Sequence, residues 1–125
     1  MALKLELKAG ERLHLGDCVV VNEGGRARLL IEGDWPVLRG KDVLEPERAD
    51  SEAKRLYLAV QSMYLTRRPG RFIADYARLS REIVSRVPER RAQVEVVDGL
   101  VASGRFYLAM RAAQRLIDEE GRVAL

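Results

Sequence analysis

The sequence predicts an α+β protein, with an N-terminal five-stranded antiparallel β module followed by a bundle of about four helices. In the first forty residues, apolar and polar residues alternate with period two, and turn residues separate the short runs. From about residue 51 onwards, apolar residues recur at three- and four-residue spacing, which is typical of amphipathic helices. We therefore place the β module at residues 1–48 and the helical bundle at residues 49–125.

The β module contains five short runs with strand character. The first is clearest, because Leu3, Leu5 and Leu7 alternate with charged residues. Asn22-Glu23-Gly24-Gly25 predicts a tight hairpin, since Asn and Gly tolerate the positive φ that such turns require. Five strands at this spacing indicate a small meander or partly open barrel, whose short last strand adds to a sheet edge or to a partner chain. The predicted strands cover residues 3–7, 12–15, 18–21, 26–31 and 36–39.

The helical part is predicted to begin at Asp50 or Ser51, because either side chain can cap a helix. The third helix has the weakest pattern, since its valines are stiff and Gly99 costs about 1 kcal/mol relative to Ala. A strand is the alternative there, although Ala92, Val96 and Leu100 keep a four-residue spacing. Gly121 is expected to stop the last helix. The predicted helices cover about residues 51–65, 71–87, 89–103 and 105–120.

The composition excludes several classes of protein. The chain has one cysteine and one histidine among 125 residues, too few for a disulfide framework, a thiolate metal site or a histidine-based catalytic triad. No apolar run approaches the ~20 residues that a membrane helix needs, and the N-terminus does not have the pattern of a signal peptide. We therefore expect a cytoplasmic protein that is not an enzyme, holds no cofactor and does not enter a membrane.

The charge is uneven along the chain. Residues 1–50 have 8 Lys/Arg and 10 Asp/Glu, whereas residues 51–125 have 14 and 9. Non-specific attraction to phosphate should therefore come mainly from the second part. The basic turn with Arg67, Arg68 and Arg71 is predicted to position an RNA backbone. A row of guanidinium groups, formed by Arg39 with Arg28 and Arg26, is predicted on the sheet; alternatively, these are solvated strand residues paired with carboxylates.

Four sequence blocks resemble the FlbT family of flagellar regulators over nearly the whole chain. In order, they are LKLELKAGERLHLGD, RLLIEGDWPVLRGKDVL, AKRLYLAVQSMYL and SGRFYLAMRAAQRLI. The resemblance implies a cytosolic post-transcriptional regulator that associates with the 5′ untranslated region of flagellin mRNA. It implies repression of translation and promotion of mRNA decay, often in opposition to a small companion flagellar protein, FlaF.

A shorter stretch, residues 10–44, is similar to the carbon storage regulator (CsrA) family of dimeric β-stranded translation repressors. The similar segments are GERLHLGDCVVV, ARLLIEG and PVLRGKDVL. This resemblance implies RNA contact through Val37 and Arg39 in the last strand, with Leu5 and Leu7 at the matching positions of the first. The basic pair that the family has in its first strand is absent here.

Two other hypotheses about the function remain. A protein-binding adaptor or chaperone would dock flagellin or FlaF in a groove on the first helix. A structural subunit would have no ligand of its own. The open edge of the last strand also predicts a homodimer formed by strand exchange. The residues predicted for partner binding are Tyr57, Leu58, Met63, Tyr64 and Leu65.

Overall fold

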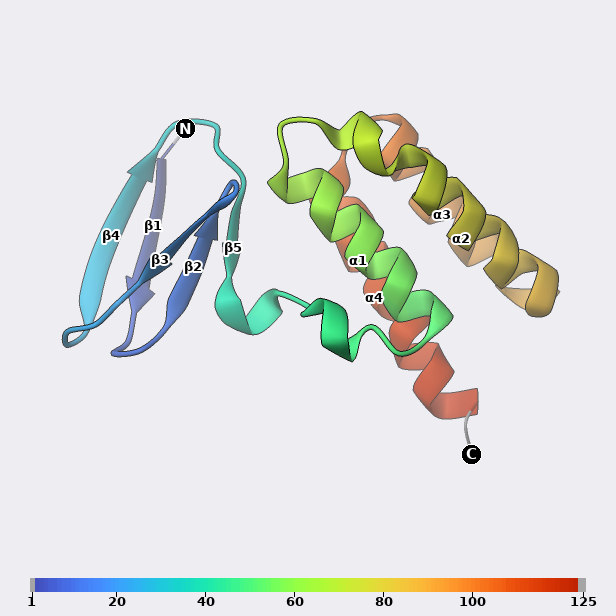
Figure 1. Ribbon diagram of the computed structural model, residues 1–125, viewed down its shortest axis with the longest axis horizontal. Coiled ribbons are helices and arrows are strands. Elements are labelled where there is room, and N and C mark those ends of the chain that lie inside the picture. Colours follow the sequence, from blue (N-terminus) through green and yellow to red (C-terminus); the bar gives the residue numbers. More distant parts are fainter. Residues whose placement is uncertain (1, 124–125) are drawn as a thin grey trace. The chain divides into compact units, whose positions relative to one another are not determined.

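The structure of the protein is a computed structural model that describes residues 2–123. The chain forms two compact units, Met1–Val43 and Leu44–Leu125 (Figure 1). The first holds the strands and the second holds the helices, which confirms the predicted α+β class. The strands are β1 (Ala2–Leu7), β2 (Arg12–Leu15), β3 (Cys18–Val21), β4 (Ala27–Glu32) and β5 (Val37–Arg39). The helices are α1 (Glu52–Leu65), α2 (Ile73–Arg86), α3 (Arg91–Ala102) and α4 (Phe106–Val123).

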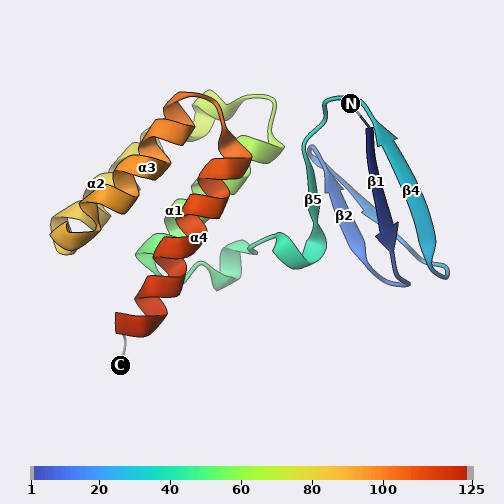
Figure 2. The same ribbon diagram turned by 180° about the vertical axis from the view of Figure 1, so that it is seen from behind.

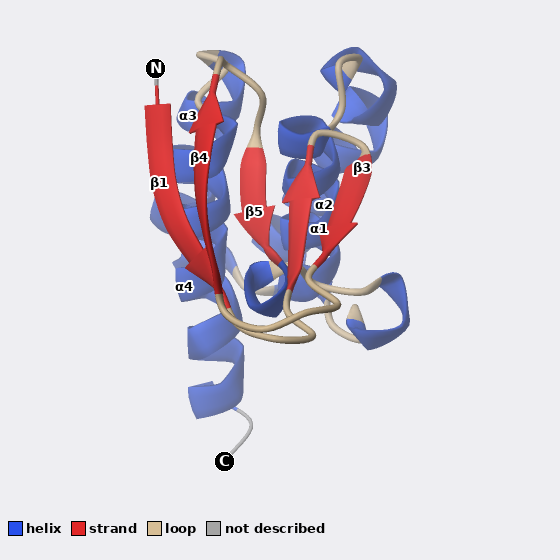
Figure 3. Cartoon of the chain, turned by 90° about the vertical axis from the view of Figure 1, so that its left-hand side faces the viewer, coloured by secondary structure: helices blue, strands red, loops and turns tan. Residues whose placement is uncertain are grey.

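The strands form two antiparallel sheets (Figure 3). One pairs β1 with β4 along their whole length, and the other places β2 between β3 and β5. The pairing is antiparallel as predicted, but the strands do not follow one another as in a meander, because the first strand pairs with the fourth. Open edges remain on β1, β4, β3 and β5 among the described strands.

The predicted hairpin at residues 22–25 is wrong, because β3 and β4 belong to different sheets. The side-chain amide of Asn22 instead donates to the carbonyls of Leu7, at 3.1 Å, and Gly25, at 2.8 Å. This residue therefore links the end of β1 to the approach to β4. The tight turn between paired strands lies at Gly16, which joins β2 to β3 with a φ of +60°.

Both sheets contribute to one small core. Leu7 of β1, Leu13 of β2 and Leu38 of β5 are all buried. The ring of Trp35 lies against Gly16, and a Cβ added there would be 2.5 Å from a ring carbon. Gly16 is therefore required both by its backbone conformation and by the space that the indole occupies.

In the helical unit, α1 and α4 run antiparallel at the centre (Figure 2). Ser51 caps α1, since its hydroxyl accepts from the Lys54 N–H. The Glu120 carboxylate near the end of α4 accepts from Ser51 Oγ and from the Ala53 N–H, at 3.1 Å. The expected stop at Gly121 is wrong, because α4 continues to Val123. The core of this unit includes the following buried residues: Ala53, Leu56, Val60, Met63, Leu79, Ile83, Val94, Val97, Ala109, Ala113 and Leu116.

Prolines delay the start of α2 and α3. Pro69 and Pro88 each begin a short 3₁₀ turn, so the α-helices start at Ile73 and Arg91. The segment 91–102 is a helix, as predicted, and not a strand. Its buried face is formed by Val94, Val97 and Val101, whereas the four-residue series Ala92, Val96 and Leu100 lies outside that face.

Candidate nucleic-acid interface

Arg39 connects the two sheets of the β unit. Its Nη1 donates to the Glu6 carbonyl at 3.1 Å and lies 3.9 Å from a carboxylate oxygen of Glu11. The side chain is 33% exposed, so solvent reaches part of the guanidinium. Arg39 therefore holds β5 to β1, and only part of its hydrogen-bonding capacity faces outwards.

Arg26 and Arg28 both lie beside Glu6. Arg26 Nε is 3.0 Å from the Glu6 carboxylate, with both side chains well exposed. Arg28 is directly opposite Glu6 in the β1–β4 register. It is exposed and has no ion pair within 4 Å among the described residues. Of the three predicted sheet arginines, Arg28 is thus the one without an ion pair among the described residues.

Val37 lies at the start of β5, opposite Leu15, and is half-buried. It is two residues from Arg39, so both side chains lie on the same face of β5. The β unit as a whole has 7 Lys/Arg and 7 Asp/Glu in residues 1–43. With no net charge, this unit can attract a polyanion only through local groups such as Arg28.

The turn between α1 and α2 carries the second group of predicted residues. Arg67, Arg68 and Arg71 are all exposed around the 3₁₀ turn Pro69–Phe72. No aspartate or glutamate occurs between Glu52 and Asp75. Asp75 itself is paired with Arg78 at 3.6 Å, so it does not neutralise the turn. The turn is therefore a local concentration of positive charge.

The residues predicted for partner binding divide into two groups. Met63, at 1% exposure, and Tyr57, at 8%, belong to the core of the helical unit. Leu58, Tyr64 and Leu65 are half-buried. The ring of Tyr64 packs against Tyr107 of α4, with centroids 5.6 Å apart and planes tilted by 51°. The side chains of Met63 and Tyr57 are thus already used within the protein.

Sequence reasoning missed a buried polar cluster between α2 and α3. The hydroxyls of Tyr76, at 2.5 Å, and Ser80, at 3.0 Å, both donate to one carboxylate oxygen of Asp98. Burial, together with the bond to Asp98, raises the pKa of the Tyr76 hydroxyl far above its ordinary value. No motif marked these residues in the sequence, because the three meet only when the two helices pack.

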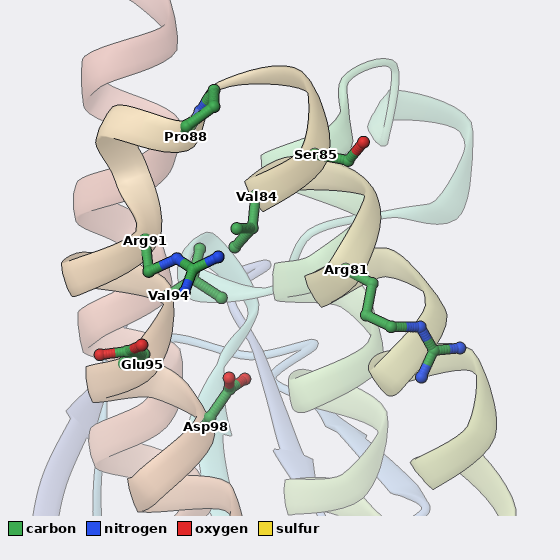
Figure 4. Close-up of a pocket in the computed structure, with 8 residues that line it drawn as sticks. All are labelled: Arg81, Val84, Ser85, Pro88, Arg91, Val94, Glu95 and Asp98. Carbon is green, nitrogen blue, oxygen red and sulfur yellow. The ribbon is translucent and has the colours of Figure 1, made fainter.

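Beside this cluster is an open cleft of about 450 Å³ (Figure 4). Arg81 of α2 and Arg91, Glu95 and Asp98 of α3 supply its charged groups. Two cations facing two carboxylates give the cleft no net charge, so it does not favour a phosphate ligand. The described residues contain no cluster of three metal-binding side chains, and none of their helices is long and apolar enough to cross a membrane.

Comparisons with known proteins identify the family. The family model described as "Flagellar protein FlbT" matches residues 3–124. A Bradyrhizobium diazoefficiens protein, named probable flagellum biosynthesis repressor protein FlbT 1, is 42% identical over 98% of this chain and 85% of its own length.

Two further relatives agree. One from Rhodopseudomonas palustris, named probable flagellum biosynthesis repressor protein FlbT, is 38% identical over 96% of this chain and 95% of its own length. The flagellum biosynthesis repressor protein FlbT of Caulobacter vibrioides is 31% identical over 96% of this chain and 87% of its own length. No solved structure is significantly similar. The chain therefore belongs to the FlbT family of flagellar proteins.

Proposed function

We propose that this protein represses flagellum biosynthesis after transcription, by associating in the cytoplasm with the 5′ untranslated region of flagellin mRNA. In this role it lowers translation of the message and promotes its decay, and it performs no chemistry of its own. The names of its relatives support a repressor of flagellum biosynthesis. The observation that supports RNA contact is the turn between α1 and α2, where Arg67, Arg68 and Arg71 are exposed. The sequence has no Asp or Glu between Glu52 and Asp75.

In this proposal, Arg68, Arg71 and Arg28 are the main phosphate contacts, because no carboxylate lies within ion-pair distance of them among the described residues. Arg67 adds to the contact at the turn, and Arg26, Arg39 and Val37 add to the contact that Arg28 makes on the β unit. Phosphate contacts position an RNA without reading its sequence. Specificity then requires base contacts, and on the β unit the half-exposed guanidinium of Arg39 is suited to them.

The experiment measures binding of a flagellin leader RNA to the purified protein by fluorescence anisotropy, across a salt series. Direct contact gives a linear fall of log K with log salt, with a slope of about −0.7 per neutralised phosphate. The double variant Arg68→Ala/Arg71→Ala should reduce the slope by about 1.4. Arg78→Ala is the matched control, because this exposed arginine is already paired with Asp75 and Glu82. Salt-independent binding, or an equal loss in the control, contradicts direct phosphate contact.

The alternative function is a protein-binding adaptor that docks flagellin or FlaF. The half-buried Leu58, Tyr64 and Leu65 on α1 favour it, since they leave some apolar surface at the helical unit. An apolar contact of this kind is nearly insensitive to salt, unlike an RNA contact. If the pure protein does not bind the leader RNA but binds purified flagellin or FlaF, the adaptor function is the correct one.

The proposal also includes a homodimer. Four of the five described strands have an unpaired edge, and the β1–β4 sheet has only two strands. Two-stranded sheets are marginally stable in water, so strand exchange with a second copy would stabilise both sheets. Light scattering coupled to gel filtration tests this point: a monomer mass throughout the micromolar range excludes the dimer.

A further inference from the structure

The helices α3 and α4 pack against each other (Figure 2). Exposed apolar side chains occur on both of them. Gln93 of α3 donates to the Glu119 carboxylate of α4 at 2.7 Å, which places the start of one helix beside the end of the other. Val96 and Leu100 follow Gln93 at i+3 and i+7, so they lie on the same flank of α3. On α4, Leu108, Ala112 and Arg115 share the flank of Glu119 by the same periodicity. We call these residues the α3–α4 seam.

The seam exposes aliphatic side chains on both helices. Val96 is 57% exposed and Leu108 is 50% exposed, whereas Leu100 and Ala112 between them are half-buried. Single exposed apolar residues are common on protein surfaces and need no explanation. Here, however, Val96 and Leu108 are accompanied on the same two packed helices by two half-buried apolar residues, Leu100 and Ala112. Such a surface accepts the apolar face of a third helix.

The charges around the seam are mainly positive. Arg105, Arg111 and Arg115 are exposed, and none has an ion pair within 4 Å among residues 2–121. Two carboxylates of α4 lie nearby, Asp118, which accepts from Gln114, and Glu119, which accepts from Gln93, so three arginines outnumber them. Arg105 immediately precedes α4, where the helix dipole adds further positive potential. Glu95 lies on the opposite flank of α3, in the cleft toward α2 (Figure 4).

We propose that the α3–α4 seam binds an amphipathic helix of a partner protein, with an apolar stripe flanked by Asp and Glu. The apolar stripe covers Val96 and Leu108, and the acidic flanks face Arg105, Arg111 and Arg115. A second copy fits the seam poorly, because it would bring the same unpaired arginines together. RNA fits it poorly as well, because bases stack on aromatic rings and the exposed apolar side chains of the seam are aliphatic. The proposal is independent of RNA contact at the α1–α2 turn.

The test uses the full chain and a fluorescein-labelled helical peptide of about 20 residues, with Leu along one face and Glu on its flanks. One control peptide has the same composition in scrambled order, and another has Lys in place of Glu. Anisotropy should show at least tenfold tighter binding of the acidic amphipathic peptide than of either control. Equal affinity for the three peptides, or a preference for the Lys peptide, overturns the proposal.

Protein variants locate the contact. Val96→Ser/Leu108→Ser should weaken peptide binding at least tenfold, whereas Ile73→Ser, a matched change at a 45% exposed aliphatic residue of α2, should stay within twofold. Arg111→Glu/Arg115→Glu should reverse the preference toward the Lys peptide, with Arg55→Glu as the control for added charge. Circular dichroism checks that each variant is folded. If the seam variants lower leader RNA affinity and leave peptide binding unchanged, the seam belongs to the RNA contact and the proposal fails.

Discussion

Removing the guanidinium of Arg39 should destabilise the β unit specifically. In Arg39→Met the aliphatic stem stays, and what is lost is the 3.1 Å bond to the Glu6 carbonyl and the approach to Glu11. A hydrogen bond from a charged donor contributes about 1.5–3 kcal/mol, and the partial exposure of this side chain lowers the expected loss to about 1–2 kcal/mol. Arg28→Met is the matched control, since it removes an exposed guanidinium from the other sheet of the same unit.

Trp35 makes this loss measurable in the β unit alone. It is the only tryptophan, so its fluorescence follows unfolding of the β unit, while far-ultraviolet circular dichroism follows mainly the helices. With an m-value of about 1 kcal/mol/M for so small a unit, Arg39→Met should lower the urea midpoint of the fluorescence transition by about 1–2 M. The midpoint should be nearly unchanged in Arg28→Met.

The same two variants separate the structural role of an arginine from RNA contact. Arg28→Met should reduce the salt slope of leader RNA binding by about 0.7, because one phosphate contact is lost. Arg39→Met should lower leader RNA affinity without changing the salt slope, because it removes a base contact and folded protein but no phosphate contact. The reasoning is refuted if Arg39→Met keeps the wild-type urea midpoint while its RNA salt slope falls.

Three further changes test the packing. Gly16→Ala should destabilise the β unit by about 1–3 kcal/mol and shift the Trp35 emission, because φ at Gly16 is +60° and the new Cβ meets the indole. Gly25→Ala is the control and should be nearly neutral, because the space around Gly25 is open. Glu120→Ala should lower the free energy of unfolding by about 1–2 kcal/mol, because Ser51 and the Ala53 N–H lose their acceptor. Thermal unfolding followed at 222 nm measures this loss, and Glu95→Ala, at an exposed residue, is the control. The raised pKa of Tyr76 means that the folded state keeps this proton after the unfolded state loses it near pH 10. Its contribution to stability is therefore complete below pH 10 and falls as the pH rises further. The melting temperature of Tyr76→Phe should therefore fall less at alkaline pH than that of the wild type. An equal fall in both proteins would mean that another group titrates.

The sequence by itself determined the α+β class, the apolar faces of β1, α2 and α4, and the family. Period-two leucines in β1 and the three- and four-residue spacing in α2 and α4 are local signals, because each element must bury one face whatever its partners are. The basic turn at Arg67, Arg68 and Arg71 was visible for the same reason, since a run without carboxylates is a property of the sequence alone.

Only the tertiary structure decided which strands pair and which charged groups remain exposed. Asn22-Glu23-Gly24-Gly25 has the composition of a hairpin, yet the Asn22 amide bonds to Leu7 and Gly25 and directs the chain into the other sheet. Arg39 and Arg28 are alike in sequence terms, but the fold places one beside the Glu6 carbonyl and leaves the other in solvent. Likewise, the pairing of Gln93 with Glu119 decides which face of α3 stays open. These outcomes depend on contacts between residues far apart in the chain, and local periodicity contains no information about them.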